Sequence, residues 1–139
     1  MADVAITEPT NRTTEPLICI TAAITIGDGN TSTEFDYFGE VIGLTILYNV
    51  AALPDADWDL RIFDEKLTDL TAGNGEALDG TTEDTLGHLV QQFGITDMGG
   101  GVPVQGKIWI GEDGMATVDS TATVYIYIMP SIPQRGLIQ

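Results

Sequence analysis

The stretch from residue 41 to residue 65, VIGLTILYNVAALPDADWDLRIFDE, restricts the fold more than any other part of the chain. Its first half places apolar side chains at every second position: Ile42, Leu44, Ile46, Tyr48 and Val50. Its second half does the same with Trp58, Leu60 and Ile62. A period of two is typical of β-strands, whose alternate side chains point to opposite faces. Pro54 and Asp55 interrupt the pattern, which predicts two strands joined by a turn.

The same alternation recurs on both sides of this stretch. Residues 17–26 carry isoleucine or alanine at even positions, and residues 121–129 place aliphatic side chains on one face and two tyrosines on the other. Residues 104–110 are predicted as one further strand, in a hairpin with 121–129, and Gly39 predicts a bend or bulge before the central strand. Short strands separated by Gly-rich turns predict an all-β fold, an antiparallel β-sandwich that is jelly-roll-like with extended terminal arms.

Two segments allow more than one interpretation. In residues 85–93, the apolar side chains fall at the spacing of a helix face: Leu86, Leu89, Val90 and Phe93. We therefore predict one short helix there, ended by Gly94, although a strand would suit the rest of the sheet. After the central stretch, Leu67 and Leu70 indicate either a loop that closes onto the core or a short extra strand.

The chain of 139 residues is long enough for one domain with a sizeable core. We predict an N-terminal arm at residues 1–16, a β-sandwich domain at 17–129 and a C-terminal tail at 130–139. The arm is rich in Thr, Glu and Pro without sustained periodicity. Such arms are either disordered or ordered by a neighbouring subunit.

The charge of the chain limits its partners. Five Lys and Arg stand against 21 Asp and Glu, for a formal net charge of -16. Phosphate binding needs clustered cations, so we expect no nucleic acid and no membrane as partner. A basic protein surface or a cation is more plausible, and solubility alone explains the charge equally well. The N-terminus does not resemble a secretory signal, no stretch is apolar enough to span a bilayer, and Cys19 is the single cysteine.

The acidic turn before Trp58 contains the only spacing that suggests a metal. Asp55, Asp57 and Asp59 repeat as at the start of a calcium loop. Leu60 then replaces the glycine of the sharp turn, and Lys66 replaces the bidentate glutamate. We therefore favour an ordinary acidic turn and predict no metal and no cofactor, with these three aspartates as weak candidates for a looser cation site.

No catalytic motif stands out. His88 is the only histidine, and no Ser lies in a nucleophile turn, so we predict that the protein is not an enzyme. Four aromatic side chains could form a platform for sugar, although sandwich cores and faces carry such residues routinely: Trp58, Trp109, Tyr125 and Tyr127.

The order of these features resembles the small β-sandwich proteins of tailed bacteriophages that decorate the capsid. The resemblance covers roughly residues 17–129 and is carried by Gly39–Leu44, Trp58–Asp64, Asp69, Leu70, Gly73, Pro103–Ile108 and Thr123–Ile128. It departs from that pattern where Glu65, Lys66 and Leu67 replace a glycine-containing turn.

This resemblance implies a structural virion protein, made in the host cytoplasm, that binds the outside of the capsid as a decoration or cement protein. Its partners would be the major capsid protein and copies of itself, in a trimer. Both termini could reach those neighbours, which makes the following residues candidates for partner binding: Ile6, Pro9, Arg12, Pro16, Ile132, Arg135 and Leu137. Two alternatives remain open, a tail- or fibre-associated virion sandwich and a calcium- or carbohydrate-binding module.

Overall fold

The computed structural model describes residues 3–7, 17–25, 29–49, 58–78, 89–113 and 120–131. Within these residues the chain forms β-strands and no helix, which confirms the all-β prediction. The strands are β1 (Asp3–Thr7), β2 (Ile18–Thr25), β3 (Gly29–Ser32), β4 (Tyr37–Tyr48), β5 (Asp59–Asp64), β6 (Val90–Phe93), β7 (Val102–Gly106), β8 (Ile108–Asp113) and β9 (Thr121–Pro130).

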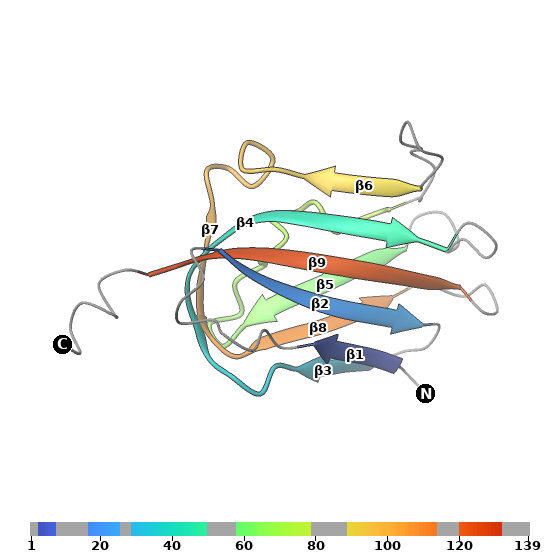
Figure 1. The fold of residues 1–139 in the computed structure, drawn as a ribbon, viewed down its shortest axis with the longest axis horizontal. Helices are drawn as coiled ribbons and strands as arrows, with labels where there is room; N and C mark the ends of the chain where they lie inside the picture. The colour runs from blue at the N-terminus through green and yellow to red at the C-terminus, as the bar shows by residue number, and fades with distance from the viewer. Residues whose placement is uncertain are drawn as a thin grey trace.

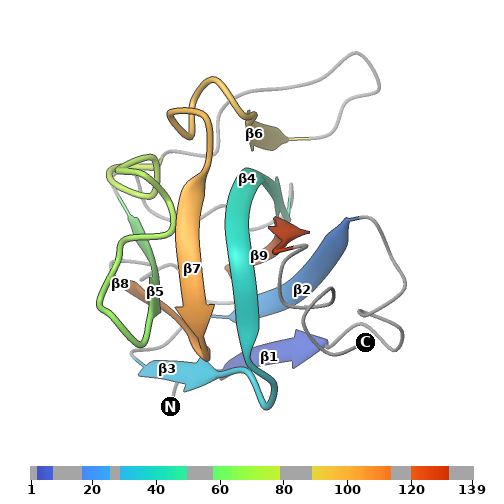
Figure 2. The same ribbon diagram turned by 90° about the vertical axis from the view of Figure 1, so that its left-hand side faces the viewer.

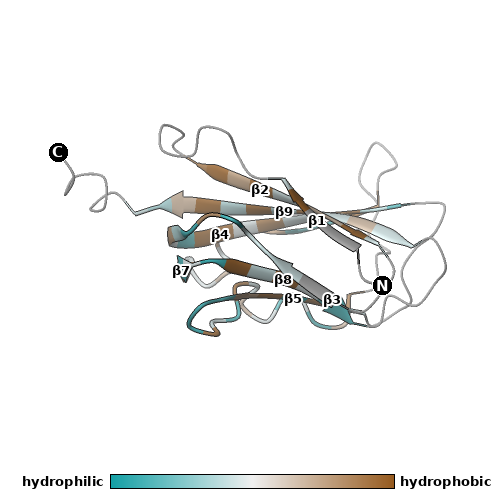
Figure 3. Cartoon of the chain, turned by 90° about the horizontal axis from the view of Figure 1, so that it is seen from below, coloured by the Kyte–Doolittle hydropathy of each residue, from teal (hydrophilic) through white to brown (hydrophobic). Residues whose placement is uncertain are grey.

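The strands form two antiparallel sheets that pack face to face (Figures 1 and 3). The large sheet has the order β1-β2-β9-β4-β6, and the small sheet has the order β3-β8-β5. One edge of β4 pairs with β9. Its other edge pairs with β7 near the start of the strand and with β6 near its end, as Figure 2 shows. This arrangement is consistent with the predicted β-sandwich, and the jelly-roll topology stays a prediction.

The core lies between the sheets and is built by alternate positions of the strands. The large sheet contributes fully buried side chains such as Ile20, Ile46 and Ile126. The small sheet contributes Ile62 and Ile110, which face them from the other layer. Burying one such side chain stabilises the fold by about 1.5–3 kcal/mol before chain entropy is counted. The hydrophobic effect therefore fixes which face of each sheet points inward.

The central stretch follows the predicted alternation except at one residue. Leu44, Ile46 and Tyr48 are buried, as predicted, but Ile42 is only half-buried and Val41 takes the core position instead. The pairing with β9 shifts register between Val41 and Gly43, which leaves Ile42 as the extra residue of a bulge. One extra residue reverses the side-chain alternation before it, so the prediction for Ile42 was wrong.

The chain changes sheets where a single strand was predicted. Residues 104–110 belong to two strands, because β7 pairs with β4 in the large sheet and β8 pairs with β3 and β5 in the small one. Gly106 makes the change of direction with φ of +87°, a conformation that glycine adopts without strain. The predicted hairpin between residues 104–110 and 121–129 was also wrong, since β8 and β9 lie in different sheets.

The helix predicted at residues 85–93 is replaced by a strand over its described part. β6 covers Val90–Phe93 and pairs with residues 44–47 of β4, and Leu89 also accepts a backbone hydrogen bond from Tyr48. Pairing with an open strand edge satisfies the backbone groups that a short helix would satisfy internally. Residues 85–88 lie outside the described part of the chain.

The predicted N-terminal arm contains a strand of the sheet. Residues 3–7 pair with residues 21–25 of β2, and Ile6 packs against the core. These five residues therefore form an edge strand at the start of the predicted arm, because the five β2 residues at 21–25 offer backbone hydrogen-bonding groups within the same chain. Residues 8–16 and 132–139 lie outside the described residues.

Candidate functional site

Of the three aspartates that were weak candidates for a calcium site, the structure describes only Asp59, and its surroundings give that site little support. The Asp59 carboxylate accepts a hydrogen bond from the Ala77 backbone at 3.0 Å and lies 3.8 Å from the Arg61 guanidinium. Asp55 and Asp57 lie outside the described residues. Among the described residues, no three His, Cys, Asp or Glu side chains gather closely enough to hold a metal ion.

Most other predicted site residues lie outside the described part of the chain: Pro9, Arg12, Pro16, His88, Ile132, Arg135 and Leu137. Ile6 is described, and its side chain is half-buried against the core. This side chain therefore has a contact within the fold, and its binding to a neighbour stays a prediction.

The structure separates the four aromatic side chains of the sugar-platform hypothesis. Trp58 is fully buried and makes an edge-to-face contact with Tyr48, with ring centroids 6.2 Å apart. Tyr125 and Tyr127 are half-buried on the outer face of the large sheet, and Trp109 lies on the outer face of the small sheet. A single stacking surface made by all four is therefore excluded.

The outer face of the large sheet has an unusual composition for this chain. Three rows of side chains cross strands β2, β9 and β4 in register: Cys19–Tyr127–Gly43, Thr21–Tyr125–Thr45 and Ala23–Thr123–Leu47. None of these nine residues is charged, although the chain carries 21 acidic residues. We call these nine residues the uncharged face. Along β4 the nearest carboxylate is Glu40, which turns toward Gly101 at the neighbouring edge.

A shallow depression of about 340 Å³ borders the uncharged face. Its lining includes Leu17, Ile42, Gly43 and Tyr127. Gly43 keeps the depression open, because a Cβ there would come within 3.1 Å of the Phe93 carbonyl oxygen and fill the space beside the tyrosine ring. The bulge supplies Ile42, so the register shift that the sequence did not reveal places an apolar side chain on this outer surface.

Cys19 belongs to the uncharged face and has a perturbed thiol. Burial raises the pKa of this thiol above its ordinary value of 9.0, and a hydrogen bond with Thr21 lowers it in part. The thiol is therefore neutral at physiological pH, in keeping with the rest of the face.

The outer face of the small sheet is charged at one end. Asp59, Arg61 and Asp113 lie together there, and the Arg61 guanidinium donates to the Asp113 carboxylate at 3.0 Å. These side chains are largely exposed, so the ion pairs add little to stability. This end has the solvated composition that the outer face of an antiparallel sheet usually shows.

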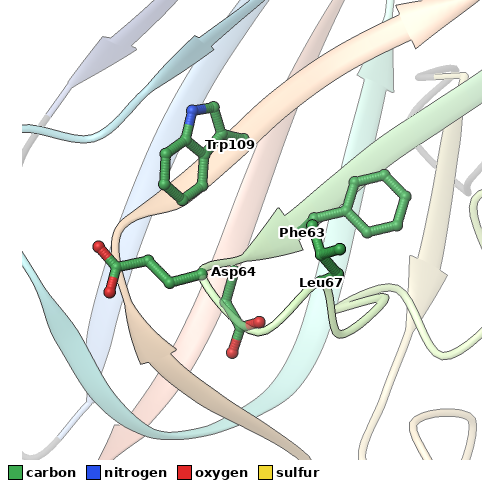
Figure 4. Close-up of a pocket in the computed structure, with 5 residues that line it drawn as sticks. Phe63, Asp64, Leu67 and Trp109 are labelled. Atoms are coloured by element: carbon green, nitrogen blue, oxygen red, sulfur yellow. The ribbon is translucent and has the colours of Figure 1, made fainter.

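The other end of the small sheet carries an apolar groove of about 390 Å³ (Figure 4). We call it the tryptophan groove; its lining consists of Phe63, Asp64, Glu65, Leu67 and Trp109. Phe63 and Trp109 are direct partners in the β5–β8 ladder, so their side chains share one face. Leu67 is 82% exposed, and Trp109 is 36% exposed.

A buried carboxylate builds the loop that presents Leu67. One Asp64 oxygen accepts hydrogen bonds from the backbone N–H groups of Lys66 and Thr68, at 2.9 and 3.0 Å. The other accepts from the Gln105 backbone N–H on β7 at 2.8 Å. These charge-assisted bonds hold Leu67 at φ of +60°, a conformation that costs a non-glycine residue roughly 1 kcal/mol.

The sequence did not identify either surface. The uncharged face depends on which residues pair across three strands that are remote in sequence, and its only local signal is the absence of charge at alternate positions of residues 19–23, 43–47 and 123–127. For Leu67 and Leu70, the sequence allowed either a loop that closes onto the core or a short extra strand. In the structure the Leu70 side chain is buried in the core, and the Leu67 side chain is exposed.

Comparison with known proteins adds no relative: no protein family, no curated protein and no solved structure matches this chain. Within the described residues, no helix has the length and apolar character needed to cross a membrane.

Proposed function

We propose that this protein is a structural binding protein that decorates the outside of a bacteriophage capsid and stabilises the shell. The observation that carries the proposal is the uncharged face. A chain with a net charge of -16 keeps nine neighbouring outward positions free of Asp and Glu, and two of them are tyrosines. Depletion of charge and enrichment of tyrosine are typical of the buried centre of protein interfaces.

The proposed role is binding without catalysis. The partners are the major capsid protein and further copies of this chain, arranged symmetrically as a trimer. Docking through the uncharged face buries neutral hydroxyl and apolar groups, so no carboxylate has to be desolvated. The acidic remainder of the surface then points to solvent, on the outside of the shell and away from packaged nucleic acid.

Co-sedimentation of the purified protein with empty heads and with detached tails of the parent phage tests the proposal. We expect saturable binding to heads, with the number of copies per shell set by the symmetry of its junctions. Binding to tails alone would replace the proposal by the tail-associated alternative. Binding to neither would overturn a virion role.

A further inference from the structure

The tryptophan groove has features that folding alone does not explain. Leu67 is an apolar side chain that is 82% exposed, and its backbone adopts a conformation that is unfavourable for leucine. The backbone conformation lowers the stability of the isolated chain and the exposed side chain contributes no burial, yet the buried Asp64 carboxylate accepts three backbone hydrogen bonds that hold this loop. Strain that the surrounding structure enforces beside an exposed tryptophan is typical of a binding surface.

The chemistry of the groove defines its ligand. Phe63, Leu67 and Trp109 offer apolar and aromatic contacts. The Glu65 side chain also lines the groove, with its carboxylate against Gly106. Lys66, the next residue along the loop, is not part of the lining. A segment with aliphatic side chains and one cation therefore fits, because the cation can lie over the indole ring near a carboxylate.

The chain itself contains a segment of this chemistry. Residues 132–139, IPQRGLIQ, carry one arginine, no Asp or Glu, and aliphatic side chains at positions 132, 137 and 138. The other cation-bearing terminal segment, residues 1–16, also carries acidic residues. Two of the five cations are already engaged, since Arg61 pairs with Asp113 and Lys107 with Asp36.

The geometry favours a neighbouring copy as the source of this segment. β9 and β5 end at the same side of the molecule in Figure 1, but β9 lies in the large sheet and the groove opens on the outer face of the small one. The Ser131 N–H still donates to the Phe38 carbonyl at 2.8 Å, which holds the chain along the direction of β9 to that point. Eight extended residues reach about 26 Å, enough to enter an adjacent molecule.

We propose that the tryptophan groove binds residues 132–139 of a neighbouring copy, with Arg135 against Trp109 and Glu65 and with Leu137 against Leu67. Copies of the chain are thereby linked through the small sheet while the uncharged face remains free. The link rests on the proposed function, in which copies of the chain are partners, and it names the contact between them. It does not depend on a capsid, so it can be tested separately from head binding.

Mixing two full-length variants tests this link by sedimentation velocity. Trp109→Ala removes the groove and keeps the tail, and Arg135→Glu removes the cation of the tail and keeps the groove. We expect each variant alone to lose at least tenfold in self-association, and an equimolar mixture to form a heterodimer through the one intact tail and the one intact groove. Phe35→Ala, at an exposed aromatic outside the groove and outside the tail, is the matched control that should associate as the unmodified chain does.

A peptide experiment provides a second measurement that does not require the groove variant to fold. A labelled peptide of residues 130–139 should bind the full-length Arg135→Glu chain saturably in fluorescence anisotropy, and a peptide with glutamate in place of the arginine should bind at least tenfold more weakly. The proposal would be overturned if the mixture formed no heterodimer or if either variant alone associated as the unmodified chain does. Equal binding of both peptides would also overturn it. Because no capsid is present, these outcomes are independent of head binding.

Discussion

The two outer faces of this sandwich differ in how they treat charge. On the large sheet, nine residues in three rows across β2, β9 and β4 contain no charge. On the small sheet, Asp59, Arg61 and Asp113 lie in the open at one end, and the strained loop of Leu67 borders an apolar groove at the other. Both faces cover the same core, so packing does not require the difference.

This comparison separates what the fold needs from what a partner needs. An outward position of an antiparallel sheet tolerates charged side chains, as Asp59 and Asp113 show on the small sheet. The lack of them across three neighbouring rows of such an acidic chain is the feature that the proposed contact with another molecule accounts for. The uncharged face is suited to a broad flat contact, and the tryptophan groove to the insertion of a few side chains.

The largest expected effect separates the core from the uncharged face on one strand. Ile46 is fully buried, and its neighbour Thr45 points to the uncharged face. Ile46→Asp should cost roughly 5 kcal/mol or more, comparable to the whole stability of a domain, because it buries an unpaired charge. Circular dichroism should show an unfolded chain, whereas Thr45→Glu should remain folded. A folded Ile46→Asp variant would contradict the assignment of the two faces.

The next effect concerns the loop that shapes the tryptophan groove. Asp64→Asn replaces one carboxylate oxygen by an NH₂ group, which can no longer accept from a backbone N–H. Urea unfolding should show a loss of about 2 kcal/mol, because a buried charge-assisted hydrogen bond is lost. Glu65→Gln, at the exposed neighbour, should leave the unfolding midpoint unchanged. An unaffected Asp64→Asn variant would mean that this carboxylate does not hold the loop.

A smaller effect is expected in the core at Trp58. Its indole N–H is buried and has no hydrogen-bond partner among the residues that the structure describes. Trp58→Phe should therefore cost only about 1 kcal/mol, since the lost packing is offset by removal of an unpaired donor. Thermal or urea unfolding measures this cost, and a loss above about 3 kcal/mol would show that the N–H is satisfied. The variant also leaves Trp109 as the single tryptophan, which reports on the groove by its emission.

The smallest effect is the titration of Cys19 on the uncharged face. Burial raises the pKa of this thiol, so the folded chain holds the proton more tightly than the unfolded chain. The contribution of this neutral thiol to the free energy of unfolding is therefore fully present below pH 9.0. It is lost as the pH rises through the raised pKa of the folded chain. The rate of reaction with a thiol reagent should show a midpoint above 9.0 in the folded chain. A midpoint below 9.0 would place Cys19 in a different environment, and Cys19→Ser is the control for stability.

The sequence predicted those parts of the fold that depend on local alternation. Ile46, Trp58 and Ile126 were placed in the core by a period of two, and burial confirms all three. Ile42 was misplaced, because a bulge depends on the pairing strand and not on the bulged residues. The strand at 90–93 was missed, because four apolar residues at helical spacing also suit a sheet edge.

The candidate sites were less predictable than the fold. The tryptophan groove joins Phe63 of β5 with Trp109 of β8, and the chain reaches β8 only after switching sheets at Gly106. Local pattern could not reveal that switch, since residues 104–110 retain an alternation typical of a single strand. The uncharged face likewise required the register of three strands before its nine positions could be recognised as neighbours.

One measurement tests the central claim, that the uncharged face is the docking surface. Co-sedimentation with empty heads should be compared for the unmodified chain, for Thr45→Glu and for Ser32→Glu. Thr45 lies in the middle row of the uncharged face, and Ser32 pairs with Trp109 on the outer face of the small sheet, so the two variants add the same charge to opposite faces. The account predicts that Thr45→Glu weakens head binding at least tenfold while Ser32→Glu binds as the unmodified chain does. Equal binding by both variants, or loss only with Ser32→Glu, would contradict it.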